Sequence, residues 1–193
     1  MIEFLNSLDS RLFLFLNGFH SPFWDTLMWH ISGKLLWLPL YLGILIYLVY
    51  KYRQQCWLPL LAIGLVILLS DQIASGILKP LVERLRPSNE PSLAGLVHLV
   101  NDYHGGKYGF ASSHASNTFG LAVFMMLLIH RKWFSISILI WAIVVSYSRI
   151  YLGVHYPGDV VVGALIGCLS ASFVYWLYGK IQEHRIKNKE HRI

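Results

Sequence analysis

The residues best suited to chemistry lie in the stretch 148–159, which separates two long apolar runs. Arg149, His155 and Asp159 would sit there where a membrane-spanning segment meets water, a depth at which charged groups are costly unless they have partners or a function. Asp159 follows His155 by four residues, so its carboxylate can bind one ring nitrogen and leave the other free to attack. Arg149 offers a planar guanidinium suited to phosphate oxygens. The alternative is a basic loop that faces lipid headgroups.

Two further groups of polar residues suit the same chemistry. Lys79 and Arg86 would supply positive charge to an anion, and a guanidinium can bind two phosphate oxygens at once. Ser112 and Ser113 begin an apolar segment, and the free N–H groups at a helix N-terminus bind anions. His114, in the first turn, could give a proton to a leaving oxygen. The alternatives are headgroup anchors for the two cations and an ordinary helix cap for the serines.

Composition indicates an integral membrane protein. Of the 193 residues, 55% are hydrophobic and 13% are charged, about half the charged content of ~25% that is usual in soluble domains. No basic stripe interleaved with aromatic residues is present, so the net charge of +6 does not indicate a nucleic-acid partner. The two cysteines, Cys56 and Cys168, predict no disulfide.

The hydropathy pattern predicts an all-α bundle of about five to six transmembrane helices in a single domain, 1–193. An amphipathic helix at 2–19 and a short helix at 22–32 form an N-terminal interfacial segment, 1–33, with no sign of a signal peptide. An outer-face loop region is expected at 79–112, and a basic, fraying helical tail at 179–193. The predicted spans are 34–50, 57–78, 113–129, 133–150 and 159–178.

Because successive spans alternate in direction, the three groups of polar residues should meet at one membrane face. Nine of the 16 Lys and Arg residues lie in short loops or the tail on the opposite side, which predicts that this opposite side is cytoplasmic. These nine are Lys51, Arg53, Arg131, Lys132, Lys180, Arg185, Lys187, Lys189 and Arg192. The site would then face the periplasm from a bacterial inner membrane.

Three polar residues outside these groups need separate interpretation. Asp71 lies inside a span, where an acid usually has a partner. It could support Lys79 or Arg86, or simply face water. His98 and His104 are interpreted as ordinary loop residues and are not placed in the site.

In their order and spacing, the three groups resemble the signature of the type 2 phosphatidic acid phosphatase superfamily. That superfamily includes membrane lipid phosphatases, glucose-6-phosphatase and the vanadium haloperoxidases. Lys79-x6-Arg86-Pro87 matches its first motif, and Ser148-Arg149-x5-His155-x3-Asp159 matches its third. The second motif departs from Pro-Ser-Gly-His, because Ala111 replaces Pro and Ser113 replaces Gly. The Gly position acts through its backbone N–H, so Ser113 is expected to serve.

The resemblance implies a phosphatase without metal or other cofactor, in which phosphate is transferred to His155 and then hydrolysed. His114 would protonate the leaving group and Asp159 would orient His155. The phosphate would be held by Lys79, Arg86, Ser112, Ser113 and Arg149.

A site at headgroup depth suits a lipid whose tails stay in the bilayer. Undecaprenyl diphosphate is the first choice of substrate, and phosphatidylglycerophosphate, phosphatidate and lipid A phosphate are the alternatives. A hypothesis of another class is a protein that binds or transports lipid phosphate without catalysis. A phosphatase for a water-soluble ester is a third. The sequence does not indicate an oligomeric state.

Overall fold

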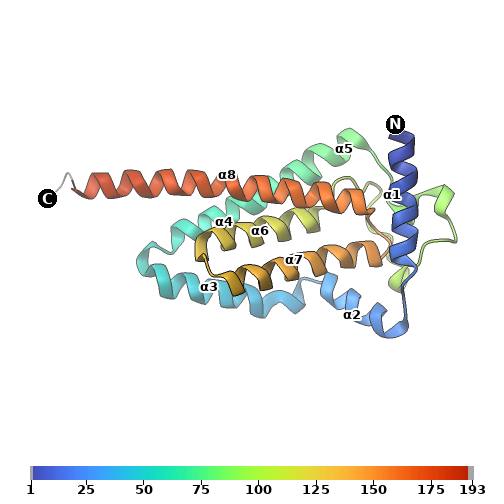
Figure 1. The fold of residues 1–193 in the computed structure, drawn as a ribbon, viewed down its shortest axis with the longest axis horizontal. Coiled ribbons are helices and arrows are strands. Elements are labelled where there is room, and N and C mark those ends of the chain that lie inside the picture. Colours follow the sequence, from blue (N-terminus) through green and yellow to red (C-terminus); the bar gives the residue numbers. More distant parts are fainter. Residues whose placement is uncertain (1, 191–193) are drawn as a thin grey trace.

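The computed structural model describes residues 2–190, and within that range helices are the only extended regular elements (Figure 1). The α-helices are α1 (Ile2–Asn17), α2 (Pro22–Ser32), α3 (Leu38–Tyr52), α4 (Trp57–Asp71), α5 (Lys79–Val82), α6 (Ser113–Ile129), α7 (Lys132–Tyr151) and α8 (Pro157–Glu190). A π-helical turn, Gln72–Leu78, joins α4 to α5. Short 3-10 turns lie at Leu35–Trp37, Arg53–Gln55, Pro87–Asn89, Pro91–Leu93 and Val100–Asp102.

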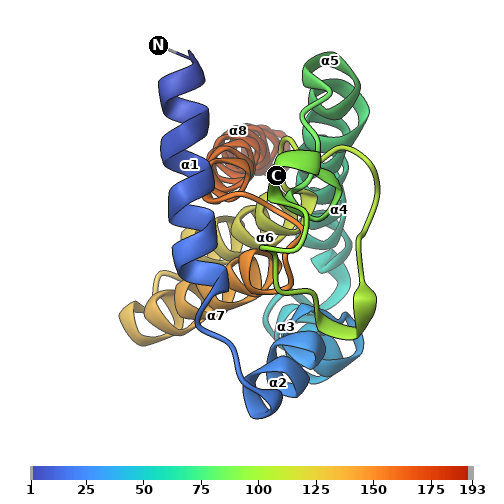
Figure 2. The same cartoon turned by 90° about the vertical axis from the view of Figure 1, so that its right-hand side faces the viewer.

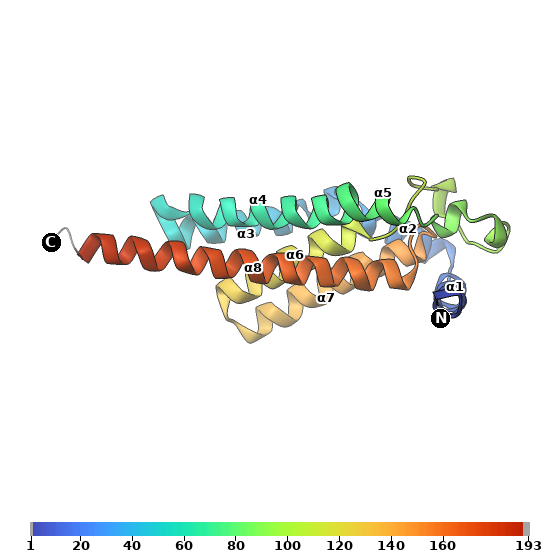
Figure 3. The same ribbon diagram turned by 90° about the horizontal axis from the view of Figure 1, so that it is seen from above.

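The long helices α3, α4, α6, α7 and α8 run roughly along one axis, and α1 lies across one end of the bundle (Figures 1 and 3). Among the residues that the structure describes, four helical stretches are long and apolar enough to cross a membrane, and a fifth, Ser113–Ile129, is apolar but shorter. The four are Leu35–Gln55, Trp57–Val82, Lys132–Tyr151 and Pro157–Asn188. The predicted all-helical membrane fold is confirmed.

Most predicted boundaries lie within a few residues of the observed ones, and the end of the second span and the tail have clear physical reasons. The span predicted at 57–78 continues to Val82, because Pro80 is tolerated in the first turn of α5 and the chain leaves the helix only at Glu83, whose φ is +52°. The tail, predicted as a fraying helix, is helical and continuous with α8 as far as Glu190, since good helix formers with no proline follow Gly179. Residues 191–193, which include Arg192, lie outside the described range.

Helix starts follow their sequence signals. Ser21 caps α2 by accepting a hydrogen bond from the N–H of Trp24, and Pro22 occupies the first turn. Pro157 begins α8 in the same way, which places Asp159 in the first turn of that helix. Ser112 caps α6.

The core of the bundle is the contact between α6 and α8, where small residues let the two backbones approach. A Cβ atom added to Gly167 of α8 would collide with the carbonyl oxygen of Ser116 and would lie 2.7 Å from the N atom of Gly120. Gly163 meets the carbonyl of Ser112 in the same way. The close approach places the N-terminal turns of α6 and α8 side by side, and these turns carry polar residues of the second and third motifs.

We expect Gly167→Ala to destabilise the protein, because the added methyl group meets backbone atoms that cannot move aside. Overpacking of this kind costs about 1–3 kcal/mol. The matched control is Gly64→Ala in α4, where nothing lies within 4 Å of an added Cβ and alanine favours the helix. Thermal unfolding in detergent should show a lower midpoint for Gly167→Ala and no decrease for Gly64→Ala. Equal midpoints would contradict this account of the α6–α8 contact.

Candidate active site

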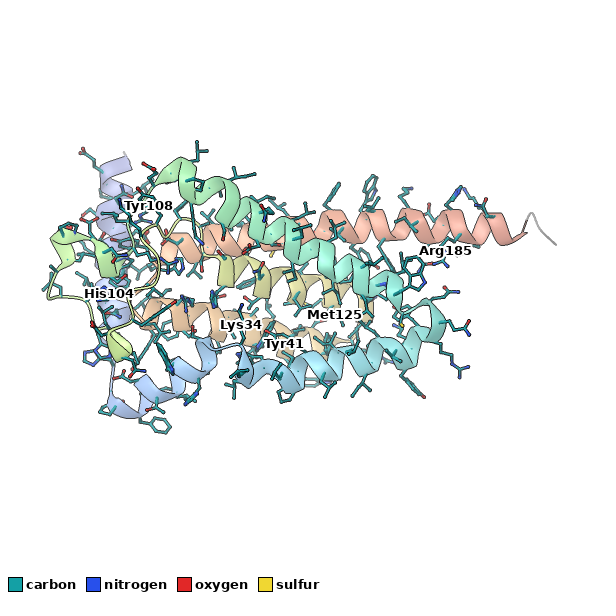
Figure 4. All side chains as sticks on the ribbon, turned by 180° about the vertical axis from the view of Figure 1, so that it is seen from behind. Lys34, Tyr41, His104, Tyr108, Met125 and Arg185 are labelled. Atoms are coloured by element: carbon teal, nitrogen blue, oxygen red, sulfur yellow. The ribbon has the colours of Figure 1, made fainter. Side chains whose placement is uncertain are left out.

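The predicted site residues gather at the end of the bundle that α1 crosses. The first turns of α6 and α8, the last turn of α7 and the loop 83–112 meet there, as the end-on view in Figure 2 shows. Figure 4 places His104 and Tyr108 at this end and Arg185 at the opposite end. The sequence prediction that alternating spans bring the three motifs to one face therefore agrees with the observed arrangement.

His155 lies in the turn between α7 and α8 and is almost fully buried, with 1% of its surface exposed. Its Nδ1 atom lies 3.4 Å from Oδ2 of Asp159, a long contact for a hydrogen bond. The same oxygen accepts a hydrogen bond of 3.1 Å from the N–H of Tyr156. Burial and the positive charges of Arg86 and Arg149 hold the pKa of His155 well below its usual range. The ring is therefore neutral, and Nε2 keeps the lone pair that a nucleophile needs.

Gly109 lies against this pair. A Cβ atom at position 109 would come within 3.0 Å of Oδ2 of Asp159 and 3.6 Å of Nδ1 of His155. Any larger residue would press on the contact between the imidazole and the carboxylate. The sequence did not single out Gly109, because the glycine of a polar loop is usually a turn residue.

Arg149 is buried near the end of α7, with 4% of its surface exposed. Its Nη1 donates a hydrogen bond of 2.6 Å to Oγ of Ser32, and its guanidinium carbon lies 5.6 Å from the ring centroid of Tyr103. Its Nε has no partner within the described residues. A buried guanidinium with an unused donor is ready to bind an anion.

Arg86 is held by the backbone of two loops. Its Nε donates to the carbonyl of Tyr108 at 3.1 Å, and its Nη1 donates to the carbonyl of Val154 at 3.4 Å. Gly105, with a φ of +67°, packs against the guanidinium, since a Cβ there would lie 2.7 Å from Nη1. These contacts place the charge of Arg86 beside the turn that carries His155.

Lys79 joins the first motif to the second. Its Nζ donates hydrogen bonds to Oγ of Ser113 at 2.6 Å and to Oγ of Ser75 at 3.1 Å. The hydroxyl of Ser75 in turn lies 3.4 Å from Oδ1 of Asp71. Of the two interpretations of Asp71, the structure therefore favours a partner of Lys79, connected through a serine that the sequence did not identify.

The start of α6 differs from the expectation in one respect. The backbone N–H of Ser112 donates a hydrogen bond of 2.9 Å to the carbonyl of Asp159, so this group is not free for a phosphate. Its hydroxyl caps the helix by accepting from the N–H of Ala115. The N–H groups of Ser113 and His114, the first of the helix, remain to point out of its end. A contact from Ser112 to phosphate would have to come from its hydroxyl.

His114 borders a cavity of about 520 Å³ that extends between α3, α4, α6 and α7. One end of the cavity is polar and includes Lys34, Asp71, Ser113 and His114. The rest is mainly apolar, with walls formed by Trp37, Tyr41, Ile44, Ile63, Ile67, Leu121 and Val145, among others. Of the predicted site residues, Ser113 and His114 line this cavity, so the start of α6 borders an apolar space.

Sequence reasoning missed two charged residues of this region. Neither Arg84 nor Asp9 was identified from the sequence as a candidate site residue. In the structure Nη1 of Arg84 lies 3.0 Å from Oδ1 of Asp159 and 2.8 Å from Oδ2 of Asp9. The one signal available was that Arg84 lies two residues before Arg86, inside the first motif.

A buried imidazole paired with a carboxylate and surrounded by cations, at one end of a membrane bundle, is the arrangement expected of a lipid phosphatase. Comparison with known families agrees: the chain belongs to the PAP2 superfamily, whose family model matches residues 59–183. The resemblance found in the three motifs is thereby confirmed, and the chain is a phosphoric monoester hydrolase of this type.

Individual relatives match most or much of the length of this chain. A lipid A 4'-phosphatase of Bacteroides thetaiotaomicron is 48% identical over 94% of this chain and 81% of its own, and one of Porphyromonas gingivalis is 37% identical over 92% and 75%. An undecaprenyl-diphosphatase of Sulfolobus acidocaldarius is 33% identical over 65% of each chain. The crystal structure of Aquifex aeolicus LpxE is 26% identical, covers 86% of this chain and 94% of its own, and superposes with a TM-score of 0.68.

Proposed function

We propose that this protein removes phosphate from a lipid A-type glycolipid through a phosphohistidine on His155. Nε2 of His155 attacks phosphorus while the bond to the lipid oxygen breaks, and His114 gives that oxygen a proton. Water then attacks the phosphohistidine and returns a proton to His114, which releases inorganic phosphate and restores His155. Lys79, Arg86 and Arg149 balance the charge on the phosphoryl oxygens during both steps.

The observation that carries this proposal is the pairing of a buried, neutral His155 with Asp159 beside cations. Nδ1 faces the carboxylate at 3.4 Å, an arrangement that favours the tautomer with the proton on Nδ1 and the lone pair on Nε2. The nearby Arg149 has a buried Nε without a partner among the described residues. A site that only bound phosphate would need the cations but not an oriented imidazole.

The choice of substrate rests on the relatives and on the cavity. The two lipid A 4'-phosphatases resemble this chain over more than nine-tenths of its length, which favours a 4'-phosphate of lipid A over undecaprenyl diphosphate, the first choice from sequence alone. Undecaprenyl diphosphate remains the second candidate because of the Sulfolobus relative. The apolar cavity beside His114 suits the hydrocarbon of either lipid.

Phosphate release from purified protein in detergent tests the proposal. The panel should contain lipid A with and without a 4'-phosphate, undecaprenyl diphosphate, phosphatidate, phosphatidylglycerophosphate and a water-soluble phosphate ester. We expect the 4'-phosphorylated lipid A to be hydrolysed with the highest kcat/KM, and a chelator to leave that rate unchanged. Faster release from undecaprenyl diphosphate would favour the second candidate. Binding of these lipids without release of phosphate would refute the enzymatic mechanism.

We further propose that the site faces the periplasm from the bacterial inner membrane, as the distribution of basic residues indicates. After Cys56 and Cys168 are replaced by serine, a cysteine at position 104 should react with a membrane-impermeant maleimide in intact cells. The matched control is a cysteine at position 185, at the opposite end of the bundle, which should react only after permeabilisation. The reverse pattern would invert the proposed orientation.

A further inference from the structure

A chain of charged residues reaches Asp159 from the side opposite His155. Oδ2 of Asp159 faces His155, while Oδ1 accepts a hydrogen bond of 3.0 Å from Nη1 of Arg84. The carboxylate is fully buried, and a buried carboxylate without a cation or sufficient hydrogen bonds is strongly destabilised. Each carboxylate oxygen therefore has a separate task, one toward the imidazole and one toward the guanidinium.

Arg84 is itself fixed in place by α1. Its Nη1 lies 2.8 Å from Oδ2 of Asp9, and the other oxygen of Asp9 accepts a hydrogen bond of 2.8 Å from the N–H of Gly158 in α8. A side chain at position 158 would collide with Asp9, since a Cβ there would lie 2.7 Å from Oδ2. The guanidinium of Arg84 also stacks on the ring of Tyr156, 3.9 Å from its centroid.

The docking of α1 is extensive enough to hold this arrangement. Phe13 of α1 is fully buried and packs edge-on against Tyr156, with ring centroids 5.5 Å apart. Asn17, at the end of α1, donates hydrogen bonds to the carbonyls of Ile150 and Tyr151 and accepts one from the N–H of His98. Helix α1 is thus bound to α7 and α8 on both sides of the turn that carries His155.

The backbone of Arg84 reaches the site as well. Its carbonyl accepts a hydrogen bond of 2.9 Å from the N–H of Gly109, the residue that lies against both His155 and Asp159. Movement of Arg84 would therefore disturb the carboxylate through its guanidinium and the imidazole through Gly109.

We infer that Arg84 is a positioning residue for Asp159 and His155, and that Asp9 of the interfacial helix holds Arg84 in its working orientation. The inference rests on the proposed role of His155 as nucleophile. Arg84 does not bind the phosphate in this account. Its guanidinium is paired with the carboxylates of Asp9 and Asp159, and it acts on His155 through Asp159. Helix α1 would then be part of the catalytic apparatus as well as a membrane-surface element.

The first test measures kcat and KM for Arg84→Met, Arg84→Lys and Asp9→Asn, with 4'-phosphorylated lipid A and with phosphatidate. Arg84→Met removes the charge-assisted hydrogen bond from Arg84 to the Asp159 carboxylate. This loss should lower kcat by about 10- to 100-fold, while KM stays close to that of the wild type. Asp9→Asn should lower kcat by a smaller factor than Arg84→Met does. Arg84→Lys should have a higher kcat than Arg84→Met, because it keeps the positive charge. The matched control, Arg11→Met, removes an exposed cation of α1 and should match the wild type.

The second test separates positioning from packing. In Arg84→Ala, added guanidinium should restore part of kcat, whereas urea, which has a similar shape but no charge, should not. Asp9→Asn should lower kcat only slightly further in the Arg84→Ala background, because the arginine that Asp9 holds is already absent. If Arg84→Ala does not yield a monodisperse protein, the loss of kcat in Asp9→Asn decides the question alone.

The outcomes distinguish this inference from the proposed function. If neither the wild type nor Arg11→Met releases phosphate from any lipid, the proposed function fails. If both are active and Arg84→Met or Asp9→Asn retains the wild-type kcat, the positioning role alone is refuted. A rise in KM with kcat unchanged, or equal rescue by guanidinium and urea, would also overturn it.

Discussion

Replacing His155 by alanine should abolish phosphate release and with it the covalent phosphoenzyme. The proposed reaction passes through a bond between phosphorus and Nε2, so an alanine at this position leaves no acceptor for the phosphoryl group. Removal of a nucleophile in a comparable site costs about 10⁶-fold in kcat, so the residual rate should lie below detection. We expect this to be the largest effect of any single substitution in the chain.

The measurement uses lipid substrate labelled in the phosphate and rapid quenching. Wild-type protein should trap label that is stable in base and released in acid, as is typical of phosphohistidine, and His155→Ala should trap none. The matched control is His104→Ala, which removes an exposed loop histidine at the same end of the bundle and should leave both turnover and trapping intact. Trapped label or normal turnover in His155→Ala would refute the nucleophilic role.

The pH dependence of the wild type offers a further check on His155. Because the pKa of this residue is held well below the usual 6.5, its ring should stay neutral and nucleophilic as the pH falls through that value. The rate of phosphoenzyme formation in single-turnover experiments should therefore show no loss that can be assigned to a group with an ordinary histidine pKa.

The main architecture of this site could be predicted because it follows from local sequence signals. Pro157 begins α8 and Ser112 caps α6, so the positions of Asp159 and His114 within their first turns are readable from neighbouring residues. Alternation of apolar spans then brings these turns to one face. Each step depends on residues close together in the chain, and such signals do not require knowledge of the folded structure.

The contacts that were missed connect residues far apart in the sequence. Arg84 and Asp159 are separated by 75 positions, and Asp9 and Gly158 by 149. A charge in a sequence shows that a partner is needed but not which residue supplies it. The engaged N–H of Ser112 escaped prediction for the same reason, since its acceptor is the carbonyl of Asp159 on another helix.

The second large effect is expected at His114, and its size should depend on the leaving group. His114→Asn removes the proton donor while keeping a polar side chain at the start of α6. General acid catalysis raises the rate by about 10²–10⁴-fold. A lipid alcohol needs this proton, because it is a poor leaving group as an alkoxide. A nitrophenolate leaves readily without a proton, so phosphoenzyme formation from nitrophenyl phosphate should be much less impaired.

The two steps can be separated by following nitrophenol and phosphate in the same reaction. In His114→Asn the first turnover should release nitrophenol rapidly, whereas phosphate should appear slowly, because the residue that accepts a proton from the attacking water is also missing. The variant should therefore accumulate phosphohistidine, which the wild type hydrolyses. His104→Ala is the matched control, since it removes an exposed histidine at the same end of the bundle that the proposed reaction does not use. Equal losses on lipid and nitrophenyl substrates, with no burst of nitrophenol, would mean that His114 binds phosphate but does not transfer protons.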